Sequence, residues 1–295
     1  MNQPRRVENL HTDKGKVPVY ATGVVDQPWD DYTTTDHAVW HQLYARQRKL
    51  LVGRASEAFL QAQDAMGMTP DQIPRFDQLN PILHAATGWT LIGVEGLLPE
   101  LDFFDHLANR RFPVTWWIRR PDQVDYIEEP DLFHDLFGHV PLLMNPVFAD
   151  YMAAYGKGGL KAHALGADAL QHLTRLYWYT VEFGLIREHG ELRIYGSGIV
   201  SSSGESIHCL DSDAPNRIAF GLERIMRTRY RIDSFQKTYF VIDSYEQLID
   251  ETEPDFTPIY AGLASAPSLP AGTVLDSDRV FNRGTGEGWP TDADA

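Results

Sequence analysis

The sequence has one cysteine, Cys209, among 295 residues. An intrachain disulfide is therefore excluded, and so is a zinc site built from several thiolates. A chain without disulfides suits a reducing compartment. There is no run of about 18 apolar residues that could span a membrane, and the polar N-terminal segment lacks the apolar stretch of a secretory signal. We therefore expect a cytoplasmic protein that does not contact a membrane.

Basic residues are also scarce. The chain has 26 Lys and Arg against 41 Asp and Glu, which gives a net charge of −15. Binding to a nucleic-acid backbone needs a surplus of cationic side chains that displace counterions, so no nucleic-acid partner is expected. An anionic membrane surface is disfavoured for the same reason. The composition, 43% hydrophobic and 23% charged, is that of an ordinary globular protein with a sizeable core.

The chain contains no internal repeat and no low-complexity linker, so we expect a single catalytic domain over residues 1–295. Its fold class should be mainly α with a few short β-strands. Residues 1–25 are interpreted as an N-terminal arm, and residues 284–295, rich in Gly, Pro and Asp, as a disordered tail.

Hydrophobic periodicity and turn residues place the individual elements. A helix should begin near Thr34, and a short one near Asp71. Further helices are expected over residues 55–65, 101–110, 131–143 (ended by Pro146), 170–188 and 244–252. Strands are expected over 112–118, 192–195 and 239–243, a strand or loop over 89–98, and a loop over 198–204.

The most informative residues are two histidines and one distant glutamate. His134 and His139 lie in the run Asp131-Leu-Phe-His-Asp-Leu-Phe-Gly-His-Val-Pro141, and Glu182 lies in the apolar run Tyr177-Trp-Tyr-Thr-Val-Glu-Phe-Gly-Leu-Ile186. A carboxylate in such a run is costly to bury unless a cation or metal compensates its charge. Two imidazoles and one carboxylate form the facial triad of non-haem Fe(II) oxygenases.

The spacing leaves alternatives open. Five residues along a regular α-helix rotate two side chains about 140° apart, although Gly138 and Pro141 weaken the helix here. The histidines could instead be one capping and one packed residue, and Glu182 could face solvent. A hydrolytic zinc site also uses two histidines and a glutamate, but its usual motif is His-Glu-x-x-His, whereas Asp135 follows His134 and the second histidine is one position later. The residues favour iron over zinc.

Several longer blocks resemble the pterin-dependent aromatic amino acid hydroxylases, and within that family the bacterial single-domain enzymes. The similarity runs from about Gln27 to about Val241. Its specific blocks are Thr87-Gly-Trp89, Glu129-Pro-Asp131 with the run to Pro141, Tyr177 to Gly184, and Tyr195-Gly-Ser-Gly-Ile-Val-Ser-Ser-Ser-Gly-Glu205.

The resemblance implies an Fe(II)- and tetrahydropterin-dependent monooxygenase that converts L-phenylalanine to L-tyrosine with O2, in phenylalanine catabolism. His134, His139 and Glu182 would bind the iron. The residues implied for the substrate are Arg119, Tyr126, Pro130, Trp178, Phe183, Gly198, Ser201 and Glu205. Those implied for the pterin are Gly96, Leu98, Phe103, Asp135 and Tyr177.

Within these sets the resemblance gives some residues particular roles. Arg119 would grip the substrate carboxylate and Ser201 would orient His134, while Phe103 would stack on the pterin. Asp135 stands where the animal enzymes carry a glutamate, and Pro113 where they carry a histidine.

Three other functions remain open at this point. Hydroxylation of tryptophan or tyrosine is the alternative within the family, because pocket shape sets that choice. A zinc hydrolase could use the same three ligands, and a non-catalytic binder of aromatic amino acids would need no metal. Since segments like the regulatory and tetramerisation parts of the animal relatives are not found, the expected state is a monomer whose partners are small molecules.

Overall fold

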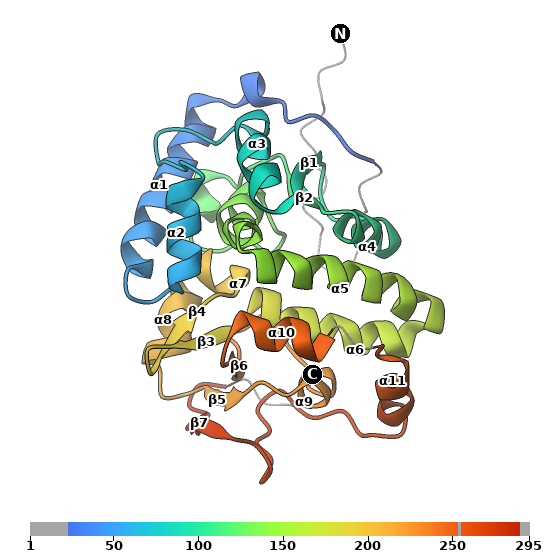
Figure 1. The fold of residues 1–295 in the computed structure, drawn as a ribbon. Helices are drawn as coiled ribbons and strands as arrows, with labels where there is room; N and C mark the ends of the chain where they lie inside the picture. Colours follow the sequence, from blue (N-terminus) through green and yellow to red (C-terminus); the bar gives the residue numbers. More distant parts are fainter. Residues whose placement is uncertain (1–22, 253–254, 290–295) are drawn as a thin grey trace.

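The computed structural model describes residues 23–252 and 255–289. Helices make up most of this part of the chain, and the strands are short, which confirms the mainly α fold class. The long helices lie in the upper and middle parts of the molecule in Figure 1, and the larger sheet lies at the lower left. Of the arm expected over 1–25, residues 1–22 lie outside the described part, and the Val25 N–H donates to the carbonyl of Gly93.

The first helices form where local capping signals predict them. α1 spans Thr34–Leu51 and begins with a capping box, in which Thr33 and Asp36 each accept a hydrogen bond from the other's backbone N–H. α2 spans Glu57–Ala65, and the Ser56 hydroxyl accepts from the N–H of Phe59. The third helix, α3, spans Phe76–Thr87 and so starts later than the expected position near Asp71.

The expected helix over 131–143 is wrong in type. Residues His134–His139 form a π-helical turn, and Val140–Met144 form a 3-10 turn. Pro146 does not end a helix; it begins α5, Pro146–Leu165, which the sequence did not predict. Proline fits the first helical position because its missing N–H would have no intrahelical partner there. The Asn145 side chain caps this end by accepting from the N–H groups of Val147 and Phe148.

The expected long helix over 170–188 is also wrong at its C-terminal end. α6 spans Ala167–Tyr177, a second π-helical turn follows over Trp178–Glu182, and β3 takes up Leu185–Glu188. Apolar residues continue through all three elements, so hydrophobicity alone does not mark the change.

Five strands form the larger sheet, in the order β4-β3-β6-β5-β7. β3 and β6 are parallel, as are β5 and β6, whereas the β3–β4 and β5–β7 pairs are antiparallel. The remaining pair, β1 and β2, is parallel and separate. The strands expected over 112–118, 192–195 and 239–243, and the strand or loop over 89–98, are confirmed with shifted ends. Their bounds are Thr90–Val94 (β1), Arg111–Thr115 (β2), Glu191–Ile194 (β4), Asn216–Ala219 (β5), Thr238–Ile242 (β6) and Val280–Asn282 (β7).

The shorter helices connect these strands. α4 and α10 confirm the helices expected over 101–110 and 244–252. The loop expected over 198–204 is wrong, because α7 and α8 occupy most of it. The bounds are Glu100–Ala108 (α4), Ser197–Val200 (α7), Ser203–Asp211 (α8), Leu222–Met226 (α9), Tyr245–Thr252 (α10) and Thr257–Leu263 (α11), with 3-10 turns at Trp29–Asp31 and Pro121–Gln123.

The first part of the expected disordered tail is ordered. The N–H groups of Thr285 and Gly286 donate to the carbonyls of Asp213 and Ala214, and the Gly284 N–H donates to the Asn216 side chain. Residues 290–295 of that prediction lie outside the described part. Among the helices of residues 23–252 and 255–289, none combines the length and the apolar character that a membrane span requires.

Helix α5 is the centre of the packing, and its close contact with α4 depends on glycine. A Cβ added at Gly156 would meet the backbone of Ala108 and lie 2.7 Å from the Cβ of Leu107. A Cβ at Gly158, two residues along the same helix, would meet nothing within 4 Å. Substitutions at these two positions therefore distinguish the effect of packing against α4 from the effect of helix propensity.

Gly156→Ala should destabilise the protein by about 1–3 kcal/mol, because the overpacked helix must move away from α4. Gly158→Ala should instead stabilise it by roughly 0.5–1 kcal/mol, since alanine loses less backbone entropy in a helix. Urea unfolding at constant slope measures both changes. Equal effects of the two substitutions would contradict this account of the α4–α5 contact.

Candidate metal centre and substrate pocket

The three residues of the metal triad lie on two π-helical turns. His134 and His139 are the first and last residues of one turn, and Glu182 is the last residue of the other. In a π-helix the backbone hydrogen bonds join residues i and i+5, so a residue five positions along the chain lies about one turn above the first. The wide turn therefore brings the two imidazoles to the same side, with ring centroids 4.8 Å apart. It removes the misalignment that five-residue spacing gives in an α-helix.

The donor atoms of the triad converge. The Nε2 atoms of His134 and His139 are 3.1 Å apart. The Glu182 oxygens lie 3.2 Å from Nε2 of His139 and 3.6 Å from Nε2 of His134. Ligands bonded at about 2.1 Å to one ion lie about 3.0 Å apart at octahedral angles and about 3.4 Å apart at tetrahedral angles. The three residues fit a single Fe(II) or Zn(II) ion, and they are the potential metal site among the described residues.

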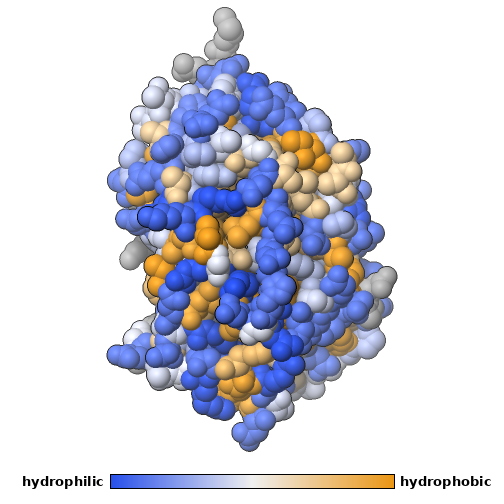
Figure 2. Space-filling model, turned by 60° about the vertical axis from the view of Figure 1, so that its left-hand side comes forward, coloured by the Kyte–Doolittle hydropathy of each residue, from blue (hydrophilic) through white to orange (hydrophobic). Residues whose placement is uncertain are grey.

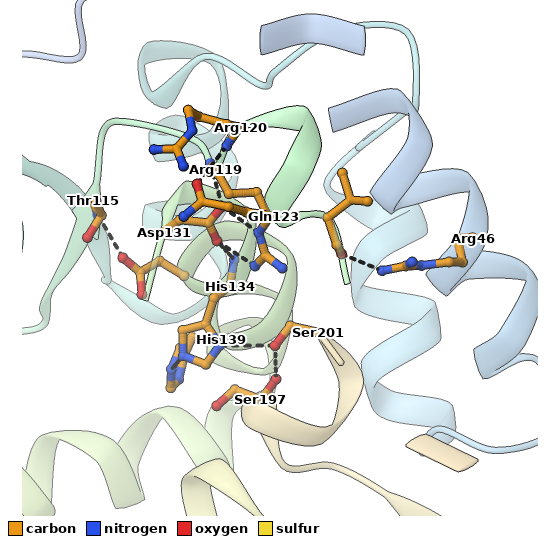
Figure 3. A network of polar contacts seen from close by, with 12 residues as sticks. Arg46, Thr115, Arg119, Arg120, Gln123, Asp131, His134, His139, Ser197 and Ser201 are labelled. Atoms are coloured by element: carbon orange, nitrogen blue, oxygen red, sulfur yellow. Dashed lines mark hydrogen bonds and ion pairs between the residues drawn. The ribbon is translucent and has the colours of Figure 1, made fainter. Parts of the chain in front are cut away.

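A chain of hydrogen bonds sets the tautomer of His134 (Figure 3). The Ser201 hydroxyl donates its only hydrogen to the carbonyl of Ser197, at 2.7 Å. In its contact with Nδ1 of His134, at 3.0 Å, the hydroxyl oxygen must then be the acceptor and Nδ1–H the donor. In a neutral imidazole the other nitrogen, Nε2, carries the lone pair that binds a metal. Ser201 therefore fixes His134 as a ligand through Nε2.

The site favours a neutral imidazole and an ionised carboxylate. Burial lowers the pKa of His134 to about 4. Burial alone would raise the pKa of Glu182, but the two histidines and the Ser197 hydroxyl, which lies 2.8 Å from Oε2, lower it to about 2. A Cβ at residue 198 would approach the Phe183 ring to 2.9 Å and Oε2 of Glu182 to 3.2 Å, so Gly198 allows α7 to lie against the carboxylate.

Asp131 ties Arg119 to the turn that carries His134. Its carboxylate is fully buried and accepts from the backbone N–H and the Nε and Nη2 groups of Arg119, at 2.8–2.9 Å, and from the backbone N–H of His134. Figure 3 shows the two side chains facing each other above the imidazoles. Asp131 thus occupies the edge of the guanidinium formed by Nε and Nη2. The hydrogens at the end of the side chain, on Nη1 and Nη2, can still donate to the carboxylate of a ligand.

All eight predicted substrate residues line one pocket of about 930 Å³, together with His134 and Glu182. This volume is within the range of small-molecule sites. Tyr126, Ile232 and Phe235 line it and are also among the exposed large apolar side chains. Figure 2 shows a face of the molecule on which apolar groups lie near the centre, bordered by hydrophilic ones. The pocket suits a ligand with an apolar body.

Glu205 is buried in the wall of this pocket. Its Oε1 accepts from the Gln236 backbone N–H at 3.1 Å and from the Tyr239 hydroxyl. Burial raises the pKa of Glu205 to about 7, more than these hydrogen bonds lower it. Glu205 therefore holds the loop before β6 against α8.

The predicted pterin residues lie beside this pocket and do not line it. Leu98 packs with Phe103, whose ring makes an edge contact with Tyr177 at 6.0 Å. Tyr177 in turn stacks loosely on His139 at 6.3 Å, and Gly96 lies in the loop after β1. Asp135 accepts from the Thr115 N–H at 2.7 Å, and burial raises its pKa to about 7. Leu98, Phe103 and Tyr177 thus form a path of apolar and aromatic contacts that ends at the metal ligand His139.

Sequence reasoning missed several residues of the site. Asp131 and Ser197 fall inside the quoted motif blocks, where a buried acid and a hydroxyl near the ligands could have been recognised as supporting groups. Gln236 and residues 287–289 also line the pocket. They come from distant parts of the chain and carry no local pattern.

Ser201→Ala should weaken Fe(II) binding about 10- to 100-fold, because His134 loses the partner that fixes its tautomer. Ser203→Ala, two residues away and outside the pocket lining, should leave the affinity unchanged. Anaerobic equilibrium dialysis measures both dissociation constants. Wild-type affinity in the Ser201 variant would show that the hydroxyl does not support the ligand.

Comparison with known proteins identifies the family. The family model described as biopterin-dependent aromatic amino acid hydroxylase matches residues 20–256. A phenylalanine-4-hydroxylase of Ralstonia nicotianae is 63% identical over 92% of this chain and 86% of its own length. Another, from Chromobacterium violaceum, is 61% identical over 89% of this chain and 88% of its own.

Solved structures agree with these matches. The Chromobacterium violaceum phenylalanine hydroxylase with bound oxidised Fe(III) superposes with a TM-score of 0.85 at 59% identity, covering 88% of this chain and 93% of that one. The same enzyme with iron and phenylalanine bound gives a TM-score of 0.83 with the same coverage. A match over most of the chain in sequence and in structure leaves one assignment: the chain belongs to the biopterin-dependent aromatic amino acid hydroxylases.

Proposed function

We propose that this protein is a phenylalanine 4-monooxygenase, which hydroxylates L-phenylalanine to L-tyrosine with O2, Fe(II) and tetrahydropterin. One observation carries the proposal: three relatives that are 63%, 61% and 54% identical to this chain are all phenylalanine-4-hydroxylases. Each of them matches at least 88% of this chain. The donor set is compatible with it, because imidazole and carboxylate ligands suit Fe(II). In the balanced reaction one oxygen atom enters the ring and the other hydroxylates the pterin.

His134, His139 and Glu182 would hold the iron, and the path from Leu98 through Phe103 to Tyr177 would hold the pterin. The bound iron and pterin supply the oxidising chemistry that amino-acid side chains lack. The protein's own residues bind and orient the reactants and exclude water.

Arg119 would bind the substrate carboxylate through its end-on hydrogens, with Asp131 holding the guanidinium in place. The side chains of Pro130, Trp178 and Phe183 would contact the aromatic ring. The Trp178 and Phe183 rings lie 4.7 Å apart, so they present a rigid apolar wall close to Glu182. Removing apolar surface from water contributes about 25 cal/mol per Å² to binding of the ring.

We also propose that the protein works as a monomer in the cytoplasm. Cys209 is free and buried, as suits a reducing compartment. A net charge of −15 opposes self-association. Sedimentation equilibrium should give a mass near 33.4 kDa, and a dimer at micromolar concentration would contradict the proposed state.

A turnover assay tests the activity. Protein loaded anaerobically with Fe(II) and mixed with tetrahydropterin, O2 and phenylalanine should form tyrosine, and Zn(II)-loaded protein should form none. Parallel reactions with tryptophan and tyrosine as substrates test the alternatives within the family. We expect kcat/KM for these two substrates to be at least about tenfold lower than for phenylalanine, because differences in pocket fit contribute about 1–3 kcal/mol. Absence of tyrosine with iron, or equal turnover of tryptophan, would reject the assignment.

A further inference from the structure

Gln236 connects three parts of the substrate pocket. Its side chain lies in the loop before β6, is 4% exposed and lines the pocket. Oε1 accepts from the indole N–H of Trp178 at 3.0 Å, and Nε2 donates to the carbonyl of Arg231 at 3.1 Å. Its backbone N–H donates to Glu205. Because an indole N–H can only donate and a carbonyl can only accept, both ends of the amide are assigned without ambiguity.

The Trp178 indole contacts two rings, Phe183 and Tyr230, and neither ring accepts a hydrogen bond from the indole N–H. The indole stacks on Tyr230 with the centroids 4.3 Å apart and the planes 13° apart. Small changes in χ1 and χ2 let stacked rings of this kind slide over each other at little cost, because the contact is weakly directional. The hydrogen bond to Gln236 is directional, so it selects the χ1 and χ2 angles of Trp178 that point the indole N–H at Oε1 of Gln236.

The position of Trp178 matters for the metal centre. Trp178 begins the π-helical turn that ends at Glu182. The indole is therefore on the same turn as a metal ligand, and it lines the same pocket as His134 and Glu182.

We propose that Gln236 is a positioning residue that orients the Trp178 indole and thereby sets where the aromatic ring of the substrate lies relative to the metal ligands. This inference rests on the proposed function, because it concerns the placement of a flat aromatic substrate. Loss of the amide would leave the indole N–H without an acceptor in a half-buried wall, and the indole would turn to find one. The pocket would then hold the ring less tightly and at a less suitable distance.

A double-mutant cycle tests the pair in the Fe(II)-loaded enzyme. Gln236→Leu should raise the KM for phenylalanine about 5- to 10-fold, as expected for one buried hydrogen bond. It should also lower the tyrosine formed per tetrahydropterin oxidised, with kcat for pterin oxidation within about twofold. Trp178→Phe removes the donor and should give a change of the same direction. In the Trp178→Phe background, Gln236→Leu should change KM by less than about twofold.

Gln63→Leu is the matched control. Gln63 is also fully buried, accepts from the Arg48 guanidinium at 3.0 Å and lies in α2, outside the pocket lining. This variant should lower the unfolding midpoint while leaving KM and the yield of tyrosine per pterin unchanged. A merely structural role for Gln236 would give the same pattern, with KM and yield unmoved.

The outcomes separate this inference from the proposed function. If wild-type protein forms no tyrosine, the proposed function fails. If wild-type protein forms tyrosine but Gln236→Leu has the same effect in both backgrounds, the amide does not act through Trp178 and the inference alone is overturned. Should Gln236→Leu not fold, Trp178→Phe decides on its own, since unchanged KM and yield there would show that the hydrogen bond positions nothing.

Discussion

The half-buried carboxylate of Glu182 is the constraint on which the rest of the site depends. An ionised group in an apolar wall is stable only if donors and positive charge surround it. The Ser197 hydroxyl supplies one donor, and the convergence of His134 and His139 on the same carboxylate creates a place where a divalent ion completes the set. Burial of the Glu182 carboxylate and binding of a metal ion therefore depend on each other, and the elements around the site bring the ligands together.

Two π-helical turns provide that arrangement. An α-helical turn would direct residues five apart to different sides, whereas the wider turn aligns His134 with His139. The second π-turn ends at Glu182, and β3 begins at Leu185, so the carboxylate is held close to the point where a helix changes into a strand. π-turns are rare because their backbone geometry is less favourable than that of the α-helix, and their presence on both sides of one site is explained by the ligand geometry that they permit.

The chemistry of this site could be predicted from the sequence better than its backbone. Imidazole and carboxylate side chains keep their ligand properties in any local structure, so the triad was recognisable. The π-turns were not, because a 3.6-residue period was assumed. Helix α5 is not predicted because a proline can either end a helix or occupy its first position, and the sequence around Pro146 does not distinguish the two. Gln236 reaches Trp178 across 58 positions, and no local pattern predicts such a contact.

Donor geometry does not distinguish iron from zinc, but the groups around the triad do bear on the choice. A zinc hydrolase needs a carboxylate or similar base that can reach the metal-bound water. Asp135, which follows the ligand His134, directs Oδ2 to the Thr115 N–H, and Oε1 of Glu205 is held by Gln236 and Tyr239. These two buried acids act as acceptors for backbone and tyrosine groups. The wall nearest Glu182 is aromatic, which suits ring binding better than the handling of a polar leaving group.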